Sequence, residues 1–126
     1  MKLSNCIIKV NQLKPYSPDA HAGTVNMRII GQETVGARNV EVVLGIIAPG
    51  GQAEPHFHTD IEQVIYLLEG RVEVGMRDEK EEMEPGDAVY FPPGEKHRVD
   101  VLGDQPARLL VIYAPPLQSK ENPFER

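Results

Sequence analysis

Short runs of apolar residues, separated by glycine, proline and charged residues, make up most of this chain. Valine, isoleucine, leucine and tyrosine dominate the runs, and no stretch keeps the 3.6-residue apolar spacing of an amphipathic helix. The pattern therefore predicts an all-β fold. The expected strands are Val25–Ile30, Val40–Ala48, Gln63–Leu68, Arg71–Arg77, Ala88–Phe91, Arg98–Leu102 and Ala107–Ala114.

Two of these segments, Gln63–Leu68 and Leu109–Tyr113, carry apolar residues at successive positions and therefore on both faces. A strand in a single sheet that faces water alternates apolar and polar residues instead. A second sheet or a second subunit must cover the outer face. This predicts a two-sheet barrel or sandwich, and we expect a homodimer.

The remaining segments are expected to be irregular. The chain has 126 residues, the size of one domain, so 1–24 and 115–126 are interpreted as chain ends rather than as separate domains. The charged run Asp78–Glu82 is predicted to be a solvated hairpin tip.

Charge and cysteine content narrow the class of protein. Nineteen acidic residues against 13 basic ones give a net charge of −6, which argues against a nucleic-acid partner. No apolar window is long enough for a membrane helix, so no membrane partner is expected. The single cysteine, Cys6, cannot form an intramolecular disulfide, which favours a cytoplasmic location. We expect Cys6 to be a small buried thiol.

Three of the four histidines stand where they could share one metal ion. His56 and His58 are two residues apart, so an extended chain places both imidazoles on one face. Glu62 and Gln63, a little downstream, could each supply an oxygen ligand. His97 follows the segment Pro92-Pro93-Gly94-Glu95-Lys96, which is predicted to form a rigid turn that delivers this histidine to the next strand.

These residues resemble the two motifs of the cupin superfamily, specifically its small single-domain (cupin 2-like) barrels. The first motif is matched by Gly50, His56, His58 and Gly70, with Glu62 or Gln63 at the acidic position; the second is matched by Gly86, Pro92, Gly94 and His97. Val101 stands where the second motif has asparagine. The resemblance implies a double-stranded β-helix, or jelly-roll, barrel over residues 1–126 with its motif core at 50–101. It also implies a metal site.

The spacing leaves a choice for the third ligand. Counting forward from His58 with the longer family spacing, and counting back from Gly70, both lead to Gln63; the shorter forward spacing leads to Glu62. Neighbouring residues on a strand face opposite sides, so both cannot point inward without a bulge. We therefore predict His56, His58, Gln63 and His97 as metal ligands, with Glu62 as the alternative to Gln63.

The choice has a chemical consequence. Imidazole ligands suit Mn, Fe, Ni, Zn or Cu, and three neutral imidazoles with a neutral amide leave a divalent ion its full charge. Such a site favours an anionic, oxygen-chelating ligand. Arg28 could pair with that anion if it faces the cavity, whereas Tyr66, Tyr90, Phe91 and Tyr113 are expected to pack in the barrel.

The resemblance implies a small metalloenzyme of the dioxygenase, isomerase, decarboxylase or lyase type that acts on a small anionic molecule. Its motifs do not select one reaction. The alternative is a non-catalytic barrel that binds or senses a small molecule or a metal. A purely structural barrel would not need the histidine set.

Overall fold

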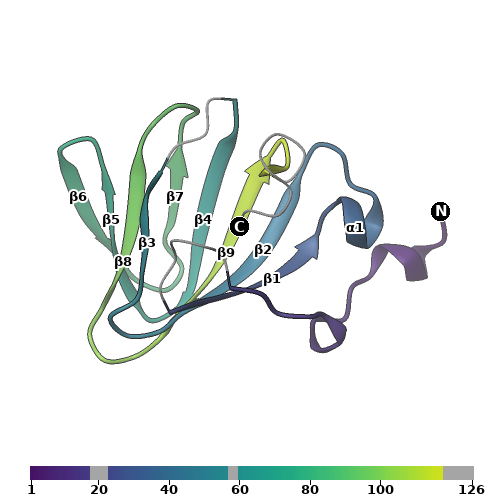
Figure 1. The fold of residues 1–126 in the computed structure, drawn as a ribbon, viewed down its shortest axis with the longest axis horizontal. Helices are drawn as coiled ribbons and strands as arrows, with labels where there is room; N and C mark the ends of the chain where they lie inside the picture. The colour runs from purple at the N-terminus through teal and green to yellow at the C-terminus, as the bar shows by residue number, and fades with distance from the viewer. Residues whose placement is uncertain (18–22, 57–59, 118–126) are drawn as a thin grey trace.

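The fold is a pair of antiparallel sheets packed face to face (Figure 1). It is taken from a computed structural model that describes residues 1–17, 23–56 and 60–117, with only the backbone for 52–56. The five-stranded sheet runs in the order β1 (Thr24–Ile30), β2 (Glu41–Ile47), β9 (Ala107–Ala114), β4 (Glu62–Glu69) and β7 (Ala88–Phe91). The four-stranded sheet runs in the order β3 (Gln52–His56), β8 (His97–Leu102), β5 (Arg71–Met76) and β6 (Glu79–Met83). The predicted all-β architecture is confirmed.

Each of the seven predicted strands agrees with an observed strand to within one residue at either end. The prediction of a hairpin tip at Asp78–Glu82 is wrong. Glu79 already pairs with Met76 at the start of β6, so the turn is formed by Arg77 and Asp78. The strand β6 ends at Met83, which is 5% exposed and anchors it in the core. The strand β3 was also not among the predicted strands.

The core lies between the sheets and follows the two-residue alternation of the strands. On β9 the buried positions are Ala107, Leu109, Val111 and Tyr113, and every residue between them is half-buried. The outer face of the five-stranded sheet is different, because Tyr66, Leu68 and Tyr90 are 36–49% exposed there. The second sheet therefore covers the inner face and leaves an apolar outer face.

Gly70 sets the tight connection between β4 and β5. Its φ of +88° lies in the left-handed region, and a Cβ atom there would come within 2.7 Å of the carbonyl oxygen of Pro106. Any side chain would meet backbone that cannot easily move. The glycine is therefore required both by the turn and by the close approach of the chain that leads into β9.

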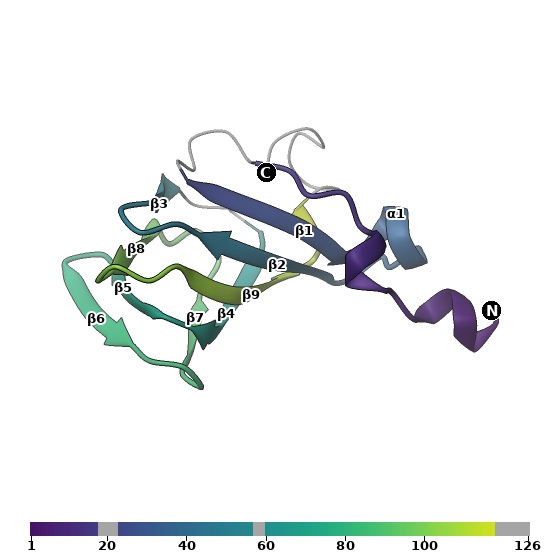
Figure 2. The same ribbon diagram turned by 90° about the horizontal axis from the view of Figure 1, so that it is seen from below.

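The N-terminal segment projects beyond the sheets beside α1 (Gln32–Val35), as Figure 2 shows. It contains two 3₁₀ turns, Leu3–Cys6 and Val10–Gln12, and is otherwise largely irregular, as predicted. Cys6 is exposed, so the expectation of a buried thiol was wrong: the short turn that carries it has no buried residues. Within the described ranges, no helix is long and apolar enough to cross a membrane.

Candidate metal and ligand site

Three residues of the candidate site stand side by side across the five-stranded sheet. Gln63 on β4 is directly opposite Tyr113 on β9 and directly opposite Phe91 on β7. Directly opposed residues in antiparallel strands point to the same face. Gln63 is 5% exposed, Tyr113 9% and Phe91 1%, so this row points into the space between the sheets.

Glu62, the alternative to Gln63, lies on the opposite face. Its side chain is exposed, and its Oε1 accepts a hydrogen bond of 2.7 Å from the phenol of Tyr90. This hydrogen bond raises the pKa of Tyr90, since it holds the phenolic proton. No register shift separates Glu62 from Gln63 in the pairing with β9, so strand alternation holds at this point. The exposed, bonded position of Glu62 favours Gln63 as the residue available to the cavity.

A turn that depends on proline and glycine delivers His97 to the first position of β8. The N–H of Glu95 donates to the carbonyl of Pro92 at 3.3 Å, and Gly94 has a φ of +82°, the left-handed conformation needed at this place in the turn. His97 follows at once as a buried residue. The predicted turn is thus present.

The imidazole of His97 is fixed on two sides. Its ring stacks on Phe91, with 4.0 Å between ring centroids and 8° between ring planes. Its Nδ1 lies 3.0 Å from the carbonyl oxygen of Glu95. A carbonyl can only accept, so Nδ1 carries the proton in the neutral ring and Nε2 carries the lone pair. This is the tautomer in which Nε2 can act as a metal ligand.

A residue between β5 and β6, Arg77, binds the turn that contains Glu95. Arg77 donates through Nη2 to the Glu95 carboxylate at 2.7 Å. This hydrogen bond lowers the pKa of Glu95, because it stabilises the charged carboxylate. The side chain of Glu95 is therefore tied to β5–β6 while its carbonyl orients His97.

Gln63 and His97 line one interior cavity. Its described lining is otherwise apolar or neutral: Thr24, Asn26, Gly45, Ile47, Ile65, Val99, Leu109, Val111 and Tyr113. No Asp, Glu, Lys or Arg is among these residues. Two buried oxygens of this wall, Oε1 of Gln63 and Oγ1 of Thr24, have no hydrogen-bond partner in the described parts of the chain.

The two described donor atoms, Oε1 of Gln63 and Nε2 of His97, fit a metal ion. An unsatisfied buried amide oxygen is costly in a folded protein and calls for a partner. Gln63 Oε1 offers a lone pair to the cavity, and His97 is held in the tautomer that leaves Nε2 as an acceptor. Both atoms are of types that transition metals accept.

The structure does not describe the side chains of the other two predicted ligands, His56 and His58. His56 ends β3 and pairs directly with His97 in the register with β8, but its side chain is not described. His58 lies outside the described residues. Among the residues that are described, no group of three or more His, Cys, Asp or Glu residues could hold a metal. The complete ligand set therefore stays a prediction.

Thr24 and Asn26 also line the cavity, although no sequence motif points to them. They lie on β1, far from the histidine motifs, and no spacing rule singles them out. The alternation of β1 could have identified them, because the apolar residues Val25 and Met27 face the other side. They add polar groups to a cavity wall that is otherwise formed by aliphatic side chains.

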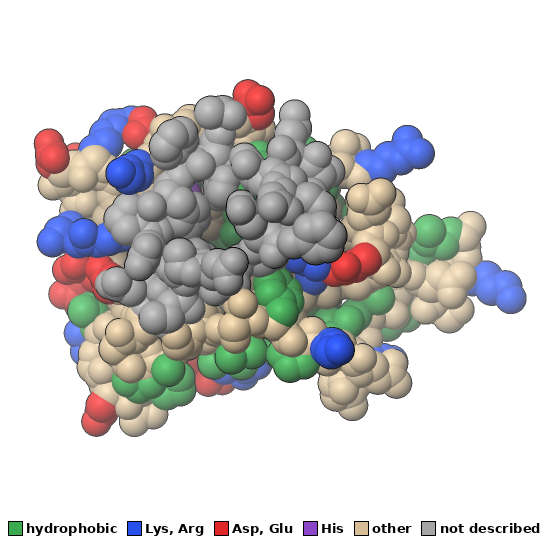
Figure 3. Space-filling view, in the orientation of Figure 1, with side chains coloured by type: hydrophobic (Ala, Val, Ile, Leu, Met, Phe, Trp, Pro, Cys, Tyr) green, Lys and Arg blue, Asp and Glu red, His purple; other side chains and the backbone are tan. Residues whose placement is uncertain are grey.

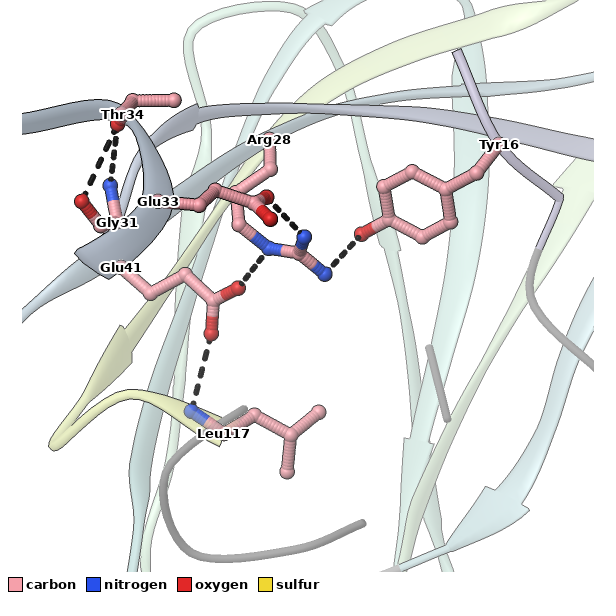
Figure 4. Close-up of polar contacts among 7 residues, drawn as sticks. All are labelled: Tyr16, Arg28, Gly31, Glu33, Thr34, Glu41 and Leu117. Carbon is pink, nitrogen blue, oxygen red and sulfur yellow. Dashed lines mark hydrogen bonds and ion pairs between the residues drawn. The ribbon is translucent and has the colours of Figure 1, made fainter. Parts of the chain in front are cut away.

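Arg28 does not serve as the cavity cation that was considered for an anionic ligand. Its Nε donates to the buried carboxylate of Glu41 at 2.6 Å, Nη1 pairs with Glu33 on α1, and Nη2 donates to the phenol of Tyr16 at 3.3 Å (Figure 4). Burial is the largest influence on the pKa of Arg28 and lowers it, but the bonds to Glu33 and Glu41 raise it overall. The guanidinium is a fixed structural cation.

Glu41 connects this cluster to the end of the chain. Its side chain is fully buried, and its Oε1 accepts the backbone N–H of Leu117 at 3.0 Å (Figure 4). A buried carboxylate needs both charge and hydrogen-bond partners, and Arg28 and Leu117 supply them. The cluster therefore fastens the segment after β9 against β1 and β2.

Comparison with known proteins supports the two-sheet fold described above. The family model described as a cupin domain, Cupin_2, matches residues 43–113. The polyketide synthase protein CurC of Streptomyces cyaneus is 30% identical over 112 residues, which cover 89% of this chain and 72% of CurC. The structure of the polyketide cyclase RemF from Streptomyces resistomycificus is 28% identical, with a TM-score of 0.77 over 92% of this chain and 80% of RemF. KdgF from Halomonas sp., 19% identical, has the same TM-score of 0.77 over 90% of this chain and 97% of its own, and shows the fold alone.

The orphaned oxygen of Gln63 yields a stability prediction. Gln63→Met replaces the amide by an apolar chain of similar size, so in metal-free protein we expect an unfolding free energy that is unchanged or about 1 kcal/mol higher. Ile65→Ala, two residues along the same inward face, should lower it by about 2–5 kcal/mol through a core cavity. Urea unfolding in EDTA measures both. A loss of more than about 2 kcal/mol in Gln63→Met would show that the amide is a structural group.

Proposed function

This chain belongs to the cupin family, and we propose that it is a metal-dependent enzyme that acts on a small, anionic, oxygen-chelating molecule. The metal would be one divalent transition-metal ion held by His56, His58, Gln63 and His97. The reaction would be of the dioxygenase, isomerase, decarboxylase, lyase or cyclase type.

One observation carries the proposal. Gln63 Oε1 is buried without a hydrogen-bond partner in the described part of the chain, and it lines the same cavity as the oriented imidazole of His97. The described cavity wall contains no carboxylate and no cationic side chain. A divalent ion held there by neutral groups would keep its charge, which favours an anionic chelate over a neutral ligand.

The protein groups have separate tasks in this proposal. When bound, the metal would polarise a chelated carbonyl or carboxylate as a Lewis acid. Phe91 and the Glu95 carbonyl hold the ring of His97, and the aliphatic wall formed by Ile65, Leu109 and Val111 excludes water. Among the described side chains of the wall, His97 and Tyr113 are of the types that commonly act as general acids or bases. Tyr113, directly opposite Gln63, is therefore the candidate proton donor.

The relatives support an enzymatic role. CurC is named as a polyketide synthase protein and RemF as a polyketide cyclase, and both match most of this chain. A polyketide chain carries repeated carbonyl groups, and its enolate form is an anionic oxygen chelate. The substrate class proposed from the cavity electrostatics therefore includes the kind of molecule named for these relatives.

The charge of the third ligand provides the test. In metal-loaded protein, Gln63→Glu keeps the size and an oxygen donor but adds a negative charge next to the chelate. We expect the affinity for oxalate, measured by calorimetry, to fall by at least about tenfold. The affinity for oxamide, a neutral analogue, should change much less.

The matched control is Glu62→Gln, which changes a charge by one unit at the neighbouring position on the outer face. It should leave oxalate affinity within error, because the exposed carboxylate is screened by water. Equal affinities for oxalate in native protein and Gln63→Glu would contradict the proposed role of Gln63. Native binding without any turnover of chelating substrates would favour the non-catalytic binding barrel.

We also propose that the chain forms a homodimer through the outer face of the five-stranded sheet. Tyr66 and Leu68 on β4 and Tyr90 on β7 are 40%, 36% and 49% exposed on that face. The apolar surface also includes Val64 on β4 and Ile112 on β9, which pair directly with each other. A second copy offers the same apolar face, so a two-fold contact would cover both.

Sedimentation equilibrium tests this assembly. The native chain should sediment at about twice its 14.0 kDa mass. Leu68→Glu, which places a charge in the proposed contact, should shift it towards the monomer. Leu3→Glu, at a residue 75% exposed on the N-terminal segment, should not. A native mass near 14.0 kDa at micromolar concentration would contradict the dimer.

A further inference from the structure

We propose that a cationic hollow on the outer face of the four-stranded sheet binds a small phosphate-type dianion. The hollow and the barrel cavity share one described lining residue, His97. The proposal does not rest on the proposed function, because it uses the cations of the hollow and not a metal ion. The hollow has a volume of about 280 Å³. The residues that define this cationic hollow are Gly75, Met76, Arg77, Glu79, Lys80, Lys96, His97 and Arg98.

The register places the hollow outside the barrel. Gly75 on β5 pairs directly with Lys80 on β6 and with Arg98 on β8. The residues next to Gly75 and Arg98, Val74 and Val99, are buried in the core, so alternation turns Gly75, Lys80 and Arg98 to the outer face. At the left edge of Figure 3, Lys and Arg side chains lie over β5 and β6, with acidic ones among them.

Gly75 provides the floor of the hollow. Its φ is outside the left-handed region, and a Cβ atom would sit at ordinary contact distances, 3.5 Å from Arg98 Cγ and 3.6 Å from Arg98 Nε. The backbone does not demand glycine at this position. The effect of glycine is to let the side chain of Arg98 lie close over the sheet, on the strand next to Gly75, with Lys80 on the strand at the other side.

The local charge is opposite to that of the whole chain. Four cations, Arg77, Lys80, Lys96 and Arg98, line the hollow with one carboxylate, Glu79. The carboxylates of Glu95 and Asp100 pair with two of these cations, so four positive and three negative charges leave a local excess of one positive charge, whereas the chain has a net charge of −6. An anion in the hollow is therefore attracted by its immediate surroundings. Glu79 lies at the edge strand and opposes binding, so the affinity will depend on the cations around Gly75.

Several of these donors remain available. Arg98 uses Nε on Asp100 at 3.0 Å, which leaves its two terminal NH₂ groups. Lys80 and Lys96 form no ion pair with the described residues. Arg77 is committed to Glu95 and contributes mainly its charge. Donors on the two strands that flank Gly75 suit an anion whose oxygens point in several directions, as those of phosphate do.

The size of the hollow limits the ligand. Pockets for drug-sized molecules have volumes of about 300–1,000 Å³, and this one is slightly smaller. A phosphate group, free or on a small molecule, fits that limit. Surface cations of this kind give modest affinity, and salt will weaken it.

A titration of the full-length, metal-free chain with inorganic phosphate tests the site. It is followed by amide NMR shifts in EDTA at constant ionic strength, so that phosphate bound to a metal cannot contribute. We expect saturable shifts centred on Gly75, Lys80 and Arg98. Lys80→Ala should weaken the apparent affinity by about two- to fivefold, as expected for the loss of one exposed charge pair. Lys9→Ala, which removes an exposed lysine of the N-terminal segment, should not change it.

Gly75→Ala is the sharper variant, because it keeps every charge and places a methyl group against the side chain of Arg98. It should abolish saturation over the range in which the native chain saturates. If this variant does not fold, Lys80→Ala/Lys96→Ala serves in its place. Native-like titration of these variants, or equal shifts from chloride, would overturn the site. Tighter saturation by malonate than by phosphate would overturn the phosphate assignment.

Discussion

Strand alternation between two facing sheets is the constraint on which the candidate site depends. Along β4, Gln63, Ile65 and Leu67 are buried while Glu62, Tyr66 and Leu68 are exposed. With Gln63 inward, Glu62 must face outward unless the strand bulges. The cavity wall therefore carries the neutral amide of Gln63 and not the charged carboxylate of Glu62. A shift of one residue along β4 would exchange the two.

The same alternation explains which strands can be predicted from the sequence. Strands rich in Val, Ile and Leu were predicted to within one residue at each end because their packing demands those side chains. The strand β6, Glu-Lys-Glu-Glu-Met, could not be recognised from apolar content, since it lies at a sheet edge and buries only Met83. Its pairing comes from β5, which local sequence does not reveal.

The partners of Arg28 were also beyond the sequence. Glu41 and Tyr16 lie more than ten residues away, and the bond from Leu117 to Glu41 spans 76 residues. Glu33 depends on α1, a four-residue helix too short for a periodic signal. Conversely, His97 and its turn were predictable, because Pro92, Gly94 and the histidine act through local geometry. Thr24 and Asn26 join the site only through the closure of the barrel.

The charged side chains of the molecule lie outside the described cavity wall. Acidic residues outnumber basic residues by 19 to 13, Arg28 is neutralised within its own cluster, and the described cavity wall consists of neutral groups. An anionic ligand in this cavity therefore requires a positive charge that the described wall does not supply. The histidines and Gln63 are the groups through which the protein could hold such a charge.

Metal content measured by elemental analysis tests this account most directly. Native protein and variants would be exposed to equal amounts of Mn²⁺, Fe²⁺, Ni²⁺ and Zn²⁺ and then desalted. The account predicts one tightly held transition-metal ion per native chain, undiminished content in Glu62→Ala, and reduced content in Gln63→Ala and His97→Ala. Native metal content in His97→Ala, or a loss in Glu62→Ala with retention in Gln63→Ala, would contradict it.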